Sequence, residues 1–165
     1  MPEYVKRLRE LVGDDELLQI ASVSIALMDA DRRVLLARHV EGQHWLLPGG
    51  AIEPGEVPAD AAIREMWEET GTAVRLTRLV GVFGGPDFIV HYRNGHRTSY
   101  VMTVFEARTE EQLGRPDGYE VLELRFMSAE ECKSVSLARW IPTVLDAIFT
   151  GAPSGAFQRH THRSF

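Results

Sequence analysis

Apolar residues recur every three to four positions in three stretches of the chain, and this period predicts amphipathic helices. The first helix covers residues 4–12, the second runs from about Pro58 to Thr70, and the third runs from Leu137 to Phe149. A fourth, short helix is predicted after Ser128, because Ser128 and Glu131 have the spacing of a capping box. Most of the remaining chain shows no helical period.

Six stretches that are rich in β-branched and aromatic residues predict strands. They cover residues 20–28, 33–39, 74–82, 88–92, 97–107 and 119–127. The polar segment 29–32 predicts a hairpin between the first two strands, and Asn94-Gly95 predicts another between the fourth and the fifth. Residues 40–55 and 109–118 are expected to form loops.

The composition is typical of one globular domain. The chain has 165 residues, of which 44% are hydrophobic and 25% are charged, and this suits a single sizeable core. We expect this domain to cover residues 1–150. From residue 151 to residue 165 the sequence turns to Gly, Pro, Ser, His and Arg without apolar periodicity, which predicts a flexible C-terminal tail.

The net charge of −6 argues against a protein that binds nucleic acid through its phosphates. A protein of this charge that acts on small phosphate compounds needs a cation. No apolar run approaches the roughly 20 residues that span a bilayer, and the N-terminus lacks the apolar core of a signal peptide. We therefore expect no membrane partner and a cytoplasmic location.

The predicted helix over 58–70 gathers acid on one face. Glu65, Glu68 and Glu69 stand at positions i, i+3 and i+4, so their like charges repel, and only Arg64 is placed to offset them. Alone, such a face is most often simply solvated, but a hard divalent cation with oxygen ligands would also resolve the repulsion. The core-facing stripe of this helix is expected from Ala59, Ala62, Ile63, Met66 and Thr70.

A glycine-rich segment precedes the acidic helix, and the two together resemble the box of the Nudix hydrolase family. The box positions matched are Gly50, Glu56, Arg64, Glu65, Met66, Glu68, Glu69 and Gly71. At average residue usage, such a match arises by chance with odds on the order of 10⁻⁸ to 10⁻⁹ per starting point. The closing aliphatic position of the box is Thr72 here, a change expected to cost some packing and to leave the chemistry untouched.

The resemblance covers roughly residues 18–149 and implies an α/β fold of the Nudix type, an α/β/α sandwich with a mixed sheet and the box loop and helix over it. It also implies metal ligands: Glu68 and Glu69 as the chief ones, Glu65 directly or through water, the carbonyl of Gly49, and Glu56 through water. The metal would be Mg²⁺, with Mn²⁺ as a substitute. Family members commonly pair, so the segment 1–17 is a possible homodimer surface.

The reaction that the resemblance implies is hydrolysis of a pyrophosphate bond by a metal-activated water. Arg64 would orient the carboxylates of the helix. The general base is open between a box glutamate, Glu120 and Glu123, and Glu120 is preferred because it stands where a loop meets a strand. Glu123 is expected to lie on that strand and to pair with a neighbour.

The substrate is expected to be a small nucleotide, either ADP-ribose or a nucleotide sugar. Arg38, Phe83 and Arg97 are candidates for holding its leaving group. One alternative is a (deoxy)nucleoside triphosphate pyrophosphohydrolase. Another is a non-catalytic nucleotide sensor with the same fold, which the complete set of four box glutamates disfavours.

Overall fold

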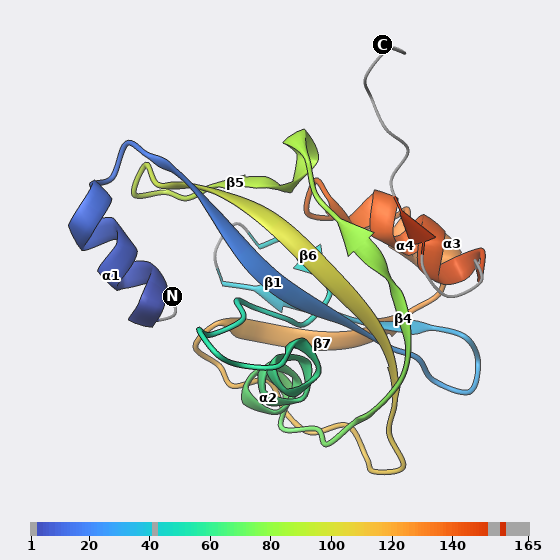
Figure 1. Ribbon diagram of the computed structural model, residues 1–165. Helices are drawn as coiled ribbons and strands as arrows, with labels where there is room; N and C mark the ends of the chain where they lie inside the picture. Colours follow the sequence, from blue (N-terminus) through green and yellow to red (C-terminus); the bar gives the residue numbers. More distant parts are fainter. Residues whose placement is uncertain (1–2, 41–42, 152–155, 158–165) are drawn as a thin grey trace.

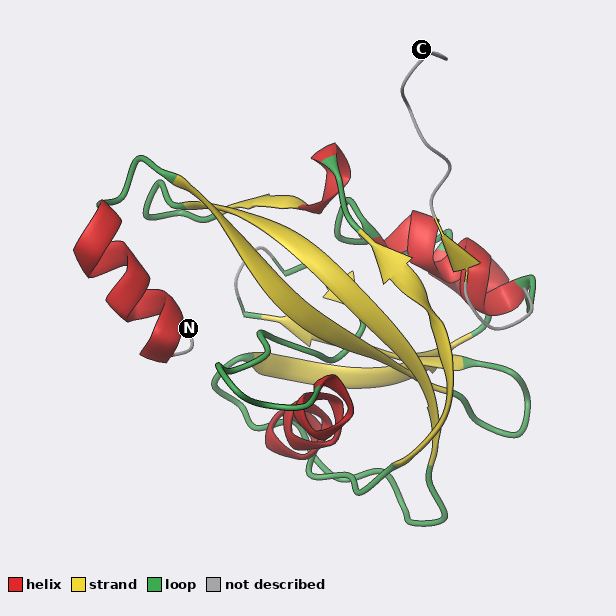
Figure 2. Ribbon diagram, viewed as in Figure 1, coloured by secondary structure: helices red, strands yellow, loops and turns green. Residues whose placement is uncertain are grey.

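The computed structural model describes residues 3–40, 43–151 and 156–157, and it places two β-sheets between helices (Figures 1 and 2). The elements in chain order are α1 (Glu3–Val12), β1 (Leu17–Leu27), β2 (Val34–His39), β3 (Trp45–Leu46), α2 (Pro58–Thr70), β4 (Arg75–Phe83), the 3₁₀ turn η1 (Pro86–Phe88), β5 (Ile89–His91), β6 (Arg97–Arg108), β7 (Val121–Met127), α3 (Ala129–Cys132), α4 (Ile141–Phe149) and β8 (Ala156–Phe157).

The larger sheet has the order β1-β6-β4-β8, with β5 also paired to β6, and the smaller sheet has the order β3-β2-β7. The larger sheet is mixed, because β1 and β6 are parallel while β4 and β6 are antiparallel. The predicted α/β class and mixed sheet are therefore confirmed. The single sheet that was expected is instead divided in two, and the short strand β3 lies inside a segment predicted to be loop.

The turn after β1 forms as predicted, but the two strands that it connects do not form a hairpin. The Asp29 carboxylate accepts hydrogen bonds from the backbone N–H groups of Asp31 and Arg33, at 3.0 and 2.8 Å. Beyond one bridge between Met28 and Val34, however, β1 pairs with β6 and β2 pairs with β7. The prediction was wrong here because the turn signal fixes only the local reversal of the chain, whereas β1 and β2 pair with distant strands in different sheets.

Alternating side chains of β1 and β2 enter two different cores. Val23, Ile25 and Leu27 pack with Leu35 against α2, whereas Ala26 and Met28 pack with neighbouring residues of β2 against α4. The two sheets together thus form the middle layer of an α/β/α sandwich. Figure 2 shows α2 and the α3–α4 pair on different sides of this layer.

The helices near the C-terminus follow their local sequence signals. Ser128 caps α3, and both hydrogen bonds of the capping box with Glu131 are present. The last helix begins at Ile141, four residues later than predicted, so that Pro142 falls in its first turn, where no backbone N–H is needed. Among the described residues, no helix is long and apolar enough to span a bilayer.

Most of the predicted flexible tail lies outside the described residues. Residues 156–157 are described as β8, which pairs in parallel with β4 at Gly81 and Val82.

Helix α1 is attached to the larger sheet by a buried arginine. The guanidinium of Arg9 donates to the carbonyl of Glu16 and to that of Arg97, both at 2.6 Å. It lies at the end of α1, where a positive charge is favourable. This side chain therefore joins α1 to Glu16, directly before β1, and to Arg97, the first residue of β6.

Replacing Arg9 with Met is expected to lower the free energy of unfolding by about 2 kcal/mol, because it removes two charge-assisted hydrogen bonds that are partly shielded from water. Urea titration followed by circular dichroism measures this difference. The matched control is Arg7→Met on the exposed face of the same helix. Equal urea midpoints for the two variants would contradict the proposed attachment.

Candidate active site

The glycine-rich loop before α2 lies along the outer edge of β1. The backbone N–H of Ile25 donates to Pro48 O and that of Val23 donates to Gly50 O, both at 2.9 Å. The approach is so close that a Cβ on Gly49 would lie 2.2 Å from the carbonyl oxygen of Val23. A Cβ on Gly50 would lie 2.4 Å from a carboxylate oxygen of Glu65. Gly49 therefore requires glycine for steric reasons, whereas a side chain at Gly50 would require the Glu65 carboxylate to move.

Helix α2 turns its acidic side further inward than the sequence predicts. Its buried residues are Ala61, Ala62, Met66, Glu69 and Thr70, whereas Ile63 is 42% exposed. The expected core stripe was therefore wrong at Ile63. The helix is rotated because Glu65 and Glu69 pack under the glycine loop, which moves Ile63 toward solvent.

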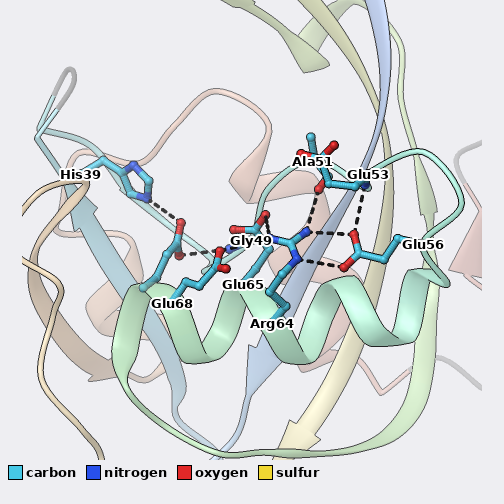
Figure 3. A network of polar contacts seen from close by, with 9 residues as sticks. His39, Gly49, Ala51, Glu53, Glu56, Arg64, Glu65 and Glu68 are labelled. Atoms are coloured by element: carbon cyan, nitrogen blue, oxygen red, sulfur yellow. Dashed lines mark hydrogen bonds and ion pairs between the residues drawn. The ribbon is translucent and has the colours of Figure 1, made fainter. Parts of the chain in front are cut away.

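Arg64 holds three of the four box glutamates (Figure 3). Its guanidinium forms a bidentate pair with Glu56, at 2.8 and 2.9 Å, and donates to Glu65 at 2.8 Å and to Glu68 at 3.1 Å. It also donates to the carbonyl of Ala51 in the loop. Hydrogen bonds from Arg64 lower the pKa of the Glu56 carboxyl, so this residue stays ionised as a fixed partner.

Glu69, the fourth box glutamate, is the most deeply buried, with a side chain that is 5% exposed. The backbone N–H of Gly49 donates to Oε2 at 3.2 Å, and Nε2 of His39 lies 3.6 Å from Oε1. Burial, reinforced by the charge of Glu65, raises the pKa of the Glu69 carboxyl well above its ordinary value of 4.5. Burial also raises the pKa of Glu65, although Arg64 opposes this shift. Both carboxylates would gain from an additional cation.

The carboxylates are suited to a metal ion by their chemistry and position. They supply hard oxygen donors on one face of α2, beside the backbone of Gly49, and Mg²⁺ and Mn²⁺ prefer such ligands. Within the ranges that the structure describes, no three His, Cys, Asp or Glu side chains are gathered as a ready ligand set. Glu65 and Glu68 are instead turned to Arg64, so binding an ion requires them to share their oxygens between the ion and Arg64.

The loop between β6 and β7 brings a further carboxylate to this cluster. Glu120, the preferred general base, is close enough that its charge contributes to the raised pKa of both Glu65 and Glu69. Glu123 instead lies on β7 and forms an ion pair with Arg38, at 3.1 Å. The structure therefore brings Glu120, and not Glu123, to the box glutamates.

A pocket of about 450 Å³ opens beside the glycine loop. Its polar residues include His39, Tyr92, Arg93 and Tyr100, and its apolar side is formed by Leu46, Leu47, Met102 and Trp140. Because His39 and Gly49 line the pocket and also contact Glu69, the pocket adjoins the carboxylate cluster directly.

The three residues expected to hold the leaving group do not line this pocket. Phe83 is 4% exposed and its ring stacks on Phe88 in the core. Arg97 lies opposite Leu17 in the sheet, about 17 Å along β1 from the bridge that Ser22 makes with the box loop. Arg38 faces β7, where it pairs with Glu123.

Sequence reasoning missed His39 and Thr72. The strand pattern gives no reason to place His39 beside Glu69; an irregularity in the pairing of β2 with β7 between Arg38 and His39 marks this point. Thr72 is fully buried, and its hydroxyl donates to Thr70 O at 3.3 Å and accepts from Gly114 N–H at 3.0 Å. The sequence did carry a signal for Thr72, because it places a hydroxyl at a position where the motif has an aliphatic residue.

Comparison with curated proteins finds relatives over the box region. Diphosphoinositol polyphosphate phosphohydrolase 2 of Mus musculus is 40% identical over 77 residues, which are 46% of this chain and 40% of that protein. A protein of Bacillus subtilis (strain 168) named putative 8-oxo-dGTP diphosphatase is 36% identical over 64 residues, 39% of this chain and 43% of that protein. The matches thus span less than half the length of these relatives.

The fold and the family model agree over most of the chain. The crystal structure of the MutT protein from Methanosarcina mazei Go1 superposes with a TM-score of 0.67 at 22% identity, covering 84% of this chain and 99% of that one. The family model of the NUDIX domain matches residues 18–147, which include the glycine loop, α2 and the loop that carries Glu120. The chain therefore belongs to the Nudix family.

Proposed function

We propose that the protein hydrolyses the pyrophosphate bond of a nucleoside diphosphate linked to another moiety, such as ADP-ribose or a nucleotide sugar, with Mg²⁺ as its cofactor and Mn²⁺ as a substitute. The observation that carries this proposal is the complete set of box glutamates directly beside a pocket, with Glu69 buried under the Gly49 backbone. A retained buried carboxylate of raised pKa is costly to folding, which is typical of a functional site.

Nudix hydrolases generally use divalent metal ions. In this chain Glu68 and Glu69 would be the chief ligands, with Glu65, the carbonyl of Gly49 and, through water, Glu56 as further ones. A bound ion would neutralise phosphate oxygens and lower the pKa of the attacking water.

The residues around the ligands have their own tasks in the proposed mechanism. Arg64 fixes Glu56 and shares its remaining donors between Glu65 and Glu68. Glu120, on the loop between β6 and β7, accepts the proton of the attacking water. The pocket beside Gly49 excludes water from the leaving group and holds it through aromatic and apolar contacts.

The pocket supports an organic leaving group larger than a phosphate. Its apolar side, which includes Leu46 and Trp140, suits a base or sugar, and Arg93 supplies a cation for the phosphate of the leaving group. The two curated relatives are named for a diphosphoinositol compound and for 8-oxo-dGTP, which share only the phosphoanhydride. The second of these names favours a nucleoside triphosphate as the alternative substrate.

Chromatographic analysis of the products tests the substrate class. We expect ADP-ribose or a nucleotide sugar to yield a nucleoside monophosphate and a sugar phosphate when Mg²⁺ is present, and no product when it is chelated. A (deoxy)nucleoside triphosphate that yields a monophosphate and pyrophosphate at a higher kcat/KM would favour the alternative. Thermal stabilisation by nucleotides without any turnover would indicate a sensor instead.

Replacing Glu69 with Gln is expected to lower Mg²⁺-dependent turnover at least about 100-fold, because it removes the charge of a principal ligand while keeping its shape. Steady-state rates with saturating Mg²⁺ measure the loss. The matched control is Glu10→Gln on the exposed face of α1. Unchanged turnover in the Glu69 variant would overturn the assignment of this ligand.

The same substitution is expected to stabilise the metal-free protein at neutral pH, by about 1 kcal/mol or 2–4 °C in Tm. The reason is that burial raises the folded-state pKa of Glu69 above its ordinary 4.5, so ionising it on the folded protein costs free energy. Stability from this group is present at low pH and is lost as the pH rises through the raised pKa. The Tm advantage of the variant, measured in EDTA, should therefore shrink as the pH falls toward 4.5.

A further inference from the structure

The segment between β6 and β7 is fastened to the C-terminal end of α2 at two residues, Gly114 and Asp117. Thr72 accepts a hydrogen bond from the N–H of Gly114, and the N–H of Asp117 donates to the carbonyl of Glu69 at 3.3 Å. Gly114 also lies so close to the helix end that a Cβ on it would be 2.3 Å from Thr70 O. The segment thus occupies the place where the last carbonyl groups of a helix lack intrahelical partners.

The Thr72 hydroxyl is well suited to fixing this segment. It is fully buried and bound on both sides, since it donates to Thr70 O at 3.3 Å and accepts from Gly114 at 3.0 Å. The hydroxyl of Thr70 continues the chain of bonds, because it accepts from the Thr72 N–H and donates to Met66 O. The closing residue of the box is therefore linked through hydrogen bonds to the interior of α2.

The fastened segment ends in a turn that presents Glu120. The carboxylate of Asp117 accepts hydrogen bonds from the backbone N–H groups of Tyr119, Glu120 and Val121, at 3.0, 3.1 and 2.9 Å. The carbonyl of Glu120 in turn accepts from the N–H of Val40. The backbone that carries Glu120 is thus held on both sides, and its distance from Glu69 depends on where Gly114 and Asp117 dock.

We propose that Thr72 is a positioning residue, whose buried hydroxyl docks the 114–120 segment on α2 and so places the Glu120 carboxylate at the box glutamates. The inference rests on the proposed function, since the role of Glu120 as base belongs to that proposal. It changes the expectation drawn from the sequence, in which Thr72 was a packing change without chemical effect. The residue contacts neither the ligands' carboxylates nor the pocket, and it acts only through the segment that it holds.

Replacing Thr72 with Val tests this role, because Val has the shape of Thr and restores the aliphatic type that the box has at this position. We expect kcat to fall between about 5-fold and 100-fold, the effect of a loosened catalytic group, while KM changes less than about 2-fold. Thr72→Ser keeps the hydroxyl and should recover most of the rate. Thr77→Val is the matched control, since it removes an exposed hydroxyl that donates to a strand carbonyl outside the segment.

A double-mutant cycle with Glu120→Gln separates positioning from general destabilisation. If Thr72 acts through Glu120, Thr72→Val should have little further effect on kcat once Glu120 is changed. An equal loss of kcat in the presence and absence of Glu120 would overturn the inference while leaving the proposed hydrolysis intact. A wild-type protein that hydrolyses nothing would overturn the proposed function instead.

Amide hydrogen exchange tests the docking without any activity. We expect the N–H groups of Gly114 and Asp117 to exchange at least about 10-fold faster in Thr72→Val than in the wild type, with protection restored in Thr72→Ser. Unchanged exchange at Gly114 in the Val variant would overturn the inference whatever the rates are. Faster exchange across the whole chain would overturn it as well, because it would show a general loss of stability.

Discussion

The close backbone contact between the glycine loop and β1 is the constraint on which the site depends. With no room for a Cβ at Gly49, the loop pairs with β1 as an additional irregular strand, and Gly50 leaves just enough space for the carboxylate of Glu65. The distance between α2 and the sheet then forces Glu69 beneath the loop. A larger residue at Gly49 would push the loop away from β1, and one at Gly50 would displace the carboxylate of Glu65.

This constraint creates an electrostatic problem that the chain resolves only in part. One guanidinium, Arg64, offsets the charges of Glu56, Glu65 and Glu68, while Glu69 is left to a backbone N–H and the ring of His39. A neutral arrangement of the same volume would be cheaper for folding, since buried charges seldom repay their desolvation. The excess negative charge is thus placed where phosphate chemistry would use a cation, and the fold alone offsets it only in part.

The sequence predicts the parts of this structure that depend on local patterns. The acidic face of α2, its end at Gly71, the capping box at Ser128 and the family itself follow from spacing and motif. Local patterns do not predict three other features: the absence of a hairpin after Leu27, the exposure of Ile63 and the placement of Phe83 in the core. Each of these depends on which surface is covered by a second layer of the fold. The same holds for His39, which reaches Glu69 through an irregularity in strand pairing, and for Thr72, whose partner lies 42 residues further along the chain.

The position of the glycine loop has a second consequence, for solubility. In the larger sheet β1 is the strand at one edge, and an uncovered edge offers unpaired N–H and C=O groups to the strands of other molecules. The loop that carries the box covers this edge from Ala21 to Ile25. A chain in which the loop detaches would disrupt the arrangement of the box and expose the edge of β1 at the same time. Selection for an active enzyme and selection against aggregation therefore act on the same few residues.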